Sequence, residues 1–201
     1  MNSPEEEVIL PYPTPVVAAR NARSTILLAS IASIREAGRF DEYTALLPAP
    51  SRDVLLDAVA GAWIPIEVAF SHYEACEALN LPVDQQVANG RMTFDKTRGT
   101  LMGTLVRMAK AGGMTPWTVY PYFQRFWERA YDGGAVRVVK VGPKEARLEL
   151  VAFRLNDSRY FRHALRGLVM GVTELFCTKS YITEKTRARA PGTVSYRMQW
   201  A

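Results

Sequence analysis

The spacing of apolar residues changes at Gly133-Gly134, and this change limits the fold more than any other feature of the sequence. Before it, apolar residues recur every three to four positions, as Leu27, Leu28, Ile31 and Ile34 do, which is typical of helices that pack by one face. After it, apolar and polar residues alternate, which is typical of strands. The sequence therefore predicts an α+β protein whose helical N-terminal half is followed by a β-rich part.

Capping residues and prolines divide the first half into helices. Gly38 stands where a helix C-terminus belongs, and Pro65 suits the first turn of a helix. We expect helices over 24–37, from about Ser51 to Ala60, from Pro65 to Leu79, from Thr93 or Asp95 to Ala111, and from Pro116 or Pro121 to Ala130.

The second half predicts two strand pairs around one helix. Residues 135–155 form a hairpin around Gly142-Pro143-Lys144, and a helix follows from Arg159 to Phe176. Strands over 179–184 and 194–200 complete the order hairpin-helix-hairpin. The expected product is a four-stranded antiparallel sheet crossed by a glycine-containing helix.

The N-terminal segment differs in composition from the rest of the chain. Three glutamates at 5–7 precede Pro11, Pro13 and Pro15, and proline disfavours helix in the residue before it. We therefore expect an extended arm over residues 1–20. Residues 21–201 are expected to form a single α+β domain, with a helical part at 21–132 and a sheet-helix-sheet part at 133–201.

The sequence shows no sign of export. No run of about 18 apolar residues could span a membrane, and glutamates stand where a secretory signal carries Lys or Arg. Two cysteines cannot make a disulfide framework. We expect a cytoplasmic protein with no membrane span.

Charge is distributed unevenly along the chain. Residues 1–90 hold twelve acidic and five basic residues, whereas residues 91–201 carry a net charge of +12. A basic half suits an anionic partner, such as nucleic acid, an acidic protein or a carboxylate-bearing small molecule. The alternative is that the two halves neutralise one another in the fold.

The C-terminal order of elements resembles a known superfamily. This ligand-binding fold is shared by haem nitric-oxide/oxygen sensor domains, vinyl-reductase-type small-molecule-binding domains and subunits of a Golgi trafficking complex. The resemblance covers residues 90–201 and includes the helix with Gly167 and Gly171 and the closing strand that ends in Tyr196-Arg197-Met198-Gln199-Trp200. The chain is also similar to a family of uncharacterised paralogous bacterial proteins expanded in myxobacteria. The resemblance implies a sensor fold with a ligand pocket near the helix that precedes the first strand.

Two departures from the haem-sensor branch bear on the cofactor. That branch has an iron-ligating histidine on the helix before the first strand, and residues 118–130 contain none. It also holds the haem propionates with a Tyr, a Ser and an Arg at alternate positions, whereas Leu155-Asn156-Asp157-Ser158-Arg159 keeps only a Ser and an Arg. We therefore expect no cofactor, and in particular no haem.

Four potential cations share one face of the helix from Arg159. Arg159, Arg162, His163 and Arg166 stand at positions i, i+3, i+4 and i+7. Arginine offers a planar donor fork for carboxylate or phosphate, so Arg159, Arg162 and Arg166 are candidates for binding the anionic group of a ligand. The alternative is a solvated basic face paired with the chain's own acids.

Aromatic residues crowd the preceding helix and go around it. We take Tyr122, Phe126 and Trp127 as candidates for an apolar pocket, since the resemblance places this helix near one. Core packing between layers is the alternative.

Catalytic and metal-binding patterns are mostly missing. His72 and Cys76 share a helix face, but only one further histidine and one further cysteine, His163 and Cys177, are present to complete a set. We expect no metal site, no catalytic residues and no enzyme activity.

Three functions remain. The first is a non-enzymatic sensor or interaction domain that binds a small apolar or aromatic ligand with an anionic group. The second is a protein-interaction or homo-oligomerisation module without a ligand, in which the aromatic helix and the closing strand form the partner surface. The third is a nucleic-acid-binding protein that uses its basic half.

Overall fold

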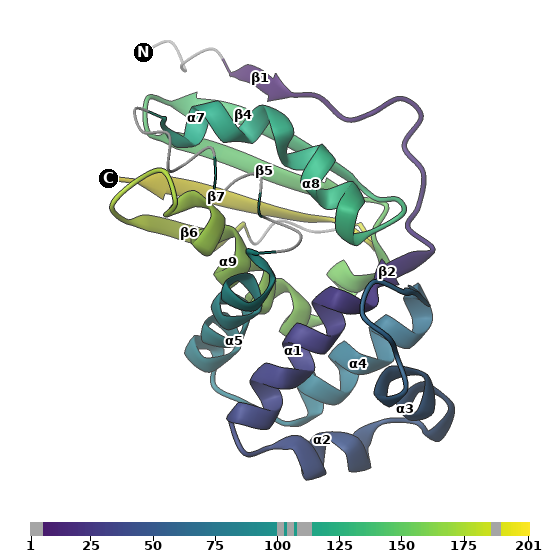
Figure 1. The fold of residues 1–201 in the computed structure, drawn as a ribbon. Coiled ribbons are helices and arrows are strands. Elements are labelled where there is room, and N and C mark those ends of the chain that lie inside the picture. The colour runs from purple at the N-terminus through teal and green to yellow at the C-terminus, as the bar shows by residue number, and fades with distance from the viewer. Residues whose placement is uncertain (1–5, 100–102, 104–106, 108–113, 186–189) are drawn as a thin grey trace.

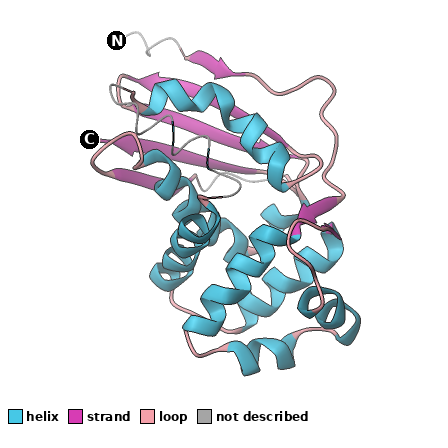
Figure 2. Ribbon diagram, in the orientation of Figure 1, coloured by secondary structure: helices cyan, strands magenta, loops and turns pink. Residues whose placement is uncertain are grey.

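The computed structural model describes residues 6–99, 103, 107, 114–185 and 190–201. Figure 1 shows a β-sheet at one end of the molecule and a group of helices at the other, and Figure 2 shows that further helices lie across the sheet. The helical part contains β2 (Asn21–Arg23), α1 (Ser24–Glu36), α2 (Phe40–Leu46), α3 (Ala49–Leu56), β3 (Trp63–Pro65), α4 (Ile66–Ala78) and α5 (Val83–Thr97). The sheet part contains β1 (Glu7–Leu10), α7 (Pro116–Val119), the 3₁₀ helix η1 (Tyr120–Tyr122), α8 (Phe123–Ala130), β4 (Ala135–Gly142), β5 (Glu145–Val151), η2 (Arg154–Asp157), α9 (Arg159–Thr173), β6 (Ser180–Glu184) and β7 (Val194–Trp200).

The sheet is antiparallel and has the strand order β1-β4-β5-β7-β6. This confirms the α+β class and the hairpin-helix-hairpin order. The sequence predicts four strands, and the fifth comes from the arm, where β1 pairs Glu7 with Lys140 and Val8 with Val139. A four-residue strand between glutamates and prolines is too short to show apolar residues at every second position. The sequence therefore predicts an extended arm but no pairing with another strand.

The helical part departs from the sequence prediction at α5. The structure begins this helix at Val83, because Pro82 has the extended conformation of an N-cap position, whereas the sequence predicts a start at Thr93 or Asp95. The pair Asn89-Gly90 is typical of a turn, but here it lies inside the helix. The predicted end at Ala111 lies outside the described residues. The predictions for α1 and α4 are confirmed within one residue at each end.

The glycines of α5 and α9 bring these two helices into backbone contact. A Cβ atom added to Gly90 would lie 1.8 Å from the carbonyl oxygen of Ala164, and one added to Gly167 would lie 1.9 Å from that of Val87. Only glycine allows this approach. The crossing fixes α9, which packs on the sheet, against the helical part.

A carboxylate from α4 caps the N-terminus of α9. Glu77 Oε2 accepts hydrogen bonds from the backbone N–H groups of Arg159 at 2.8 Å and Tyr160 at 3.3 Å, and from the Ser158 hydroxyl at 3.2 Å. Ser158 also accepts from the N–H of Phe161 at 3.2 Å. These bonds satisfy N–H groups that a helix leaves unpaired at its start, and the negative charge complements the helix dipole.

Replacing Glu77 by alanine is expected to lower the free energy of unfolding by about 1 to 2 kcal/mol, since it removes both a cap and a favourable charge. Chemical denaturation with and without high salt measures this. The exposed Glu74→Ala serves as the control on the same helix. Equal stabilities of the two variants would contradict the capping role.

A buried polar group ties α1, α2 and α4 together. The imidazole of His72 is fully buried and contacts the Tyr43 hydroxyl through Nδ1 at 2.7 Å and the Ser30 hydroxyl through Nε2 at 3.0 Å. Cys76 Sγ lies 3.8 Å from both ring nitrogens. Burial lowers the pKa of His72 to about 3, so the ring is neutral at physiological pH.

Candidate ligand cavity

A cavity lies between α8, α9 and the inner face of the sheet. Alternation along β4 and β5 points Val136, Leu148 and Leu150 toward the helices, because successive side chains of a strand face opposite sides. The helix α9 contributes one apolar face, and Ile26 of α1 closes the end near the helical part. The remaining lining residues are Phe123, Phe126, Trp127, Ala130, Tyr131, Leu165, Leu168, Val169 and Val172.

The helix α8 is held over the cavity by side-chain bonds to the sheet. The side chain of Gln124 accepts a hydrogen bond from the N–H of Val136 at 2.8 Å. The indole N–H of Trp127 donates to the carbonyl of Gly133 at 2.8 Å. With its one polar atom satisfied at the edge, the Trp127 ring presents only apolar surface to the cavity.

The cavity has a volume of about 70 Å³ and an almost entirely apolar lining. Tyr131 is the one described lining residue that carries a hydroxyl; burial raises its pKa, and the hydroxyl is bonded to Tyr73. The volume is roughly half of the ~150 Å³ of an apolar cavity that accommodates benzene or xenon in another protein. The described walls therefore fit a small, uncharged, apolar molecule.

Two of the three predicted pocket residues line this cavity. Phe126 and Trp127 do so, whereas Tyr122 lies on η1 with 39% of its surface exposed. Sequence reasoning missed the strand residues Val136, Leu148 and Leu150, although their alternation with charged residues marks them as one face of a sheet. The rest of the aromatic cluster packs elsewhere: Trp117 and Tyr120 contact Trp200 with ring centroids 4.8 and 5.6 Å apart.

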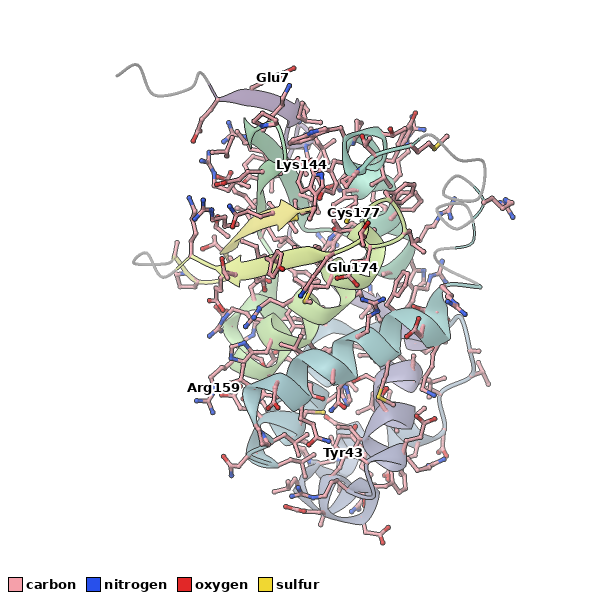
Figure 3. All side chains as sticks on the ribbon, turned by 90° about the vertical axis from the view of Figure 1, so that its left-hand side faces the viewer. Glu7, Tyr43, Lys144, Arg159, Glu174 and Cys177 are labelled. Atoms are coloured by element: carbon pink, nitrogen blue, oxygen red, sulfur yellow. The ribbon has the colours of Figure 1, made fainter. Side chains whose placement is uncertain are left out.

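The predicted anion-binding arginines are not among the residues that line the cavity. Arg162 pairs with Glu184 at 2.9 Å, and Arg166 donates to the carbonyl of Ile182 at 3.1 Å, so both connect α9 to β6. Arg159 lies 3.6 Å from Glu77, and Figure 3 shows it at the surface of the molecule. The three arginines do share one face of α9, but Arg162 and Arg166 point toward β6 at the edge of the sheet.

Ion pairs also join the acidic first half to the basic second half. Glu36 pairs with Lys96 at 2.5 Å, Glu67 with Arg154 at 3.6 Å, and Glu7 with Lys140 at 2.9 Å. These ion pairs neutralise part of the charge asymmetry within the fold. Among the described residues, no group of three or more His, Cys, Asp or Glu is placed to hold a metal ion, and no helix has the length and apolar character needed to cross a membrane.

Solved structures that are similar to this chain include H-NOX proteins. No family model matches the sequence, and no curated protein matches it. An Fe(II) unliganded H-NOX protein from K. algicida is similar over 89% of this chain and 96% of its own, with 12% identity and a TM-score of 0.64. An oxygen-binding H-NOX domain related to soluble guanylate cyclases covers 89% and 94%, with 14% identity and a TM-score of 0.56. A structure described under the modulation of haem redox potential by porphyrin distortion covers 89% and 94%, with 13% identity and a TM-score of 0.59.

These comparisons correct the expectation about the cofactor. The missing histidine on residues 118–130 led us to expect no haem, but the structures that share the fold include haem proteins. One missing ligand is a weak argument against a cofactor whose contacts come mostly from a large apolar pocket. Haem is therefore a candidate ligand that has to be measured.

The described residues by themselves do not fit haem. Among the described residues that line the cavity, none is a histidine, cysteine or methionine that could ligate iron, and the cavity volume of ~70 Å³ is far below the several hundred cubic ångströms of pockets for larger ligands. At the segment matched to the propionate contacts, Ser158 caps α9 and the Asn156 amide donates to the carbonyl of Gly192. What the comparison does establish is the architecture: this chain has the fold of the haem nitric-oxide/oxygen sensor domains.

Proposed function

We propose that this protein is a non-enzymatic ligand-binding sensor domain whose cavity takes a small apolar molecule. The observation that carries the proposal is the apolar cavity between α8, α9 and the sheet, in a fold shared with H-NOX domains, one of which binds oxygen. Phe126 and Trp127 are the aromatic contacts of the ligand in this proposal. Such a ligand would touch α8 and α9 at once, so its binding can change how the two helices pack.

The first test is native mass spectrometry of the purified protein beside its denatured mass, together with an absorbance spectrum. A mass excess that is lost on denaturation supports the proposal. A Soret band identifies the ligand as haem and shows that the cavity opens to admit it. An apo mass combined with no xenon response, measured as below, contradicts the proposal.

Filling the cavity is expected to abolish binding. Ala130 lines it from α8, and Ala130→Leu places a larger aliphatic side chain in the space. We expect xenon to shift the methyl resonances of Val136, Leu148 and Val169 in the wild-type protein. In Ala130→Leu these shifts should need at least about tenfold more xenon, at a stability change of about 1 to 3 kcal/mol.

The control is Ala45→Leu, the same substitution at an exposed position of α2. It should leave the xenon response unchanged. If both variants respond like the wild type, xenon is binding elsewhere and the assignment of the cavity fails.

A further inference from the structure

A second hollow lies on the opposite face of the sheet from the cavity. The strand alternation that points Leu148 inward points Arg147 and Glu149 outward, onto a face where β5 and β7 are bordered by the N-terminal arm. The groove there has a volume of about 600 Å³, within the range of small-molecule sites. The described polar residues that line it are Glu6, Tyr12, Arg147, Glu149, Lys185, Thr193 and Ser195.

The floor of this groove is a preorganised arginine. Arg147 is 17% exposed, and its Nε–H donates to Glu149 Oε1 at 2.6 Å. Glu149 is held in turn by the Tyr12 hydroxyl at 3.2 Å and by Arg137 at 3.4 Å. The guanidinium is therefore fixed from one side, and its two terminal nitrogens point at the arm.

The chain itself supplies a carboxylate to those nitrogens. Glu6 Oε1 and Oε2 accept from Arg147 Nη1 and Nη2 at 2.5 and 2.7 Å, which is the bidentate geometry of a carboxylate on an arginine fork. Glu6 is 49% exposed and precedes β1, whose pairing with β4 is irregular between Val8 and Leu10. Because about half of the Glu6 side chain is exposed, a carboxylate from solution can reach the arginine fork and compete with Glu6 for it.

Ser195 adds a polar atom that lacks a partner. Its Oγ is buried and makes no hydrogen bond in the described structure. Ser195 stands opposite Glu149 in the ladder between β5 and β7, so it lies diagonally across from Arg147 on the same face. Buried polar atoms are normally satisfied, and an orphan in a groove marks a place where a ligand atom fits.

We propose that this groove binds a small carboxylic acid, whose carboxylate takes the place of Glu6 on Arg147 and thereby releases the N-terminal arm. A planar carboxylate can accept both hydrogen bonds from the two terminal nitrogens of Arg147, as the Glu6 carboxylate does. The Glu149 carboxylate beside the fork disfavours a dianion such as phosphate, because like charges would then meet at close range. The two sites share only Leu150 among their described lining residues, and this groove takes a polar ligand where the cavity takes an apolar one.

Butyrate, a monocarboxylate that resembles a free glutamate side chain, is the probe, with sodium chloride at equal ionic strength as the reference. Binding is followed by the ¹⁵N–¹H signals of the Arg147 side chain and the Ser195 amide. Because Glu6 competes from within the chain, Glu6→Gln and Glu6→Ala should bind butyrate at least about tenfold more tightly than the wild type. The double variant Glu6→Gln with Arg147→Lys keeps the positive charge but lacks the fork, and it should lose the binding.

Arg197→Lys is the matched control. Arg197 forms an equally bidentate pair with Glu145, at 2.7 and 2.8 Å, directly across the ladder from Arg147. In the Glu6→Gln background this variant should keep its butyrate affinity, and circular dichroism verifies the fold of each variant. Three outcomes overturn the proposal: no gain on removing Glu6, an equal response to chloride, or binding of inorganic phosphate in preference to butyrate.

Discussion

Replacing Gly167 by alanine is expected to lower the free energy of unfolding by about 3 kcal/mol or more. The new Cβ would meet the carbonyl oxygen of Val87 at 1.9 Å and the amide nitrogen of Arg91 at 2.8 Å. Both are backbone atoms inside α5, so they cannot rotate away, and the two helices must separate. The gain of about 1 kcal/mol in helix propensity that alanine offers over glycine is too small to compensate.

Urea denaturation measures this effect, and Gly90→Ala should behave in the same way from the other helix. Gly99→Ala is the control, because a Cβ there meets no atom of the described residues within 4 Å. If Gly167→Ala matched Gly99→Ala in stability, the close crossing of α5 and α9 would be incorrect.

Acid is expected to destabilise the protein through His72 by up to about 5 kcal/mol. In the unfolded chain the imidazole takes up a proton near pH 6.5, whereas burial lowers its folded-state pKa to about 3. Between these values the unfolded state binds the extra proton, so stability falls as the pH drops from about 6.5 to about 3. The slope is about 1.4 kcal/mol per pH unit, and the full contribution of His72 is present above pH 6.5.

The comparison with His72→Gln isolates this contribution from that of the carboxylates. The variant cannot titrate at this position, so it should be less stable than the wild type at pH 7.5 but should lose less stability on acidification. His163→Gln is the control, because the side chain of His163 is only partly buried. Its pKa is lowered, first by burial and then by the positive charge of the nearby Arg166, but the shift is not large. An unchanged acid slope in His72→Gln would show that His72 is already protonated in the folded protein.

The sequence predicted elements whose pattern is local. The period of the apolar residues located α1, and alternation located β5 and β7. The sequence did not predict elements whose structure depends on a partner that is distant in the chain. The segment β1 is a strand only because it pairs with the edge of β4, and Gly90 belongs to a helix only because α9 lies against it. Such contacts join residues far apart in the chain, and no local window contains them.

The candidate cavity and arginine residues also divide into those that a local pattern predicts and those that depend on distant contacts. Phe126 and Trp127 were found because they are large aromatics on the helix before the first strand. Tyr122 points elsewhere because η1 is a 3₁₀ helix, whose tighter turn rotates each residue further than an α-helix does. The stripe of Arg162 and Arg166 was correctly placed on one face of α9, but the sequence could not show that β6 folds back to occupy that face.

The contact between α5 and α9 limits few positions of the sequence, so the sequence can change widely while the fold is kept. A crossing made by backbone against backbone specifies little beyond the absence of a side chain at Gly90 and Gly167. Residues around the crossing can be replaced by residues of other size and polarity while α5 and α9 keep their relative position. This gives a physical reason why a chain with 12% identity to a structural neighbour can keep the same architecture.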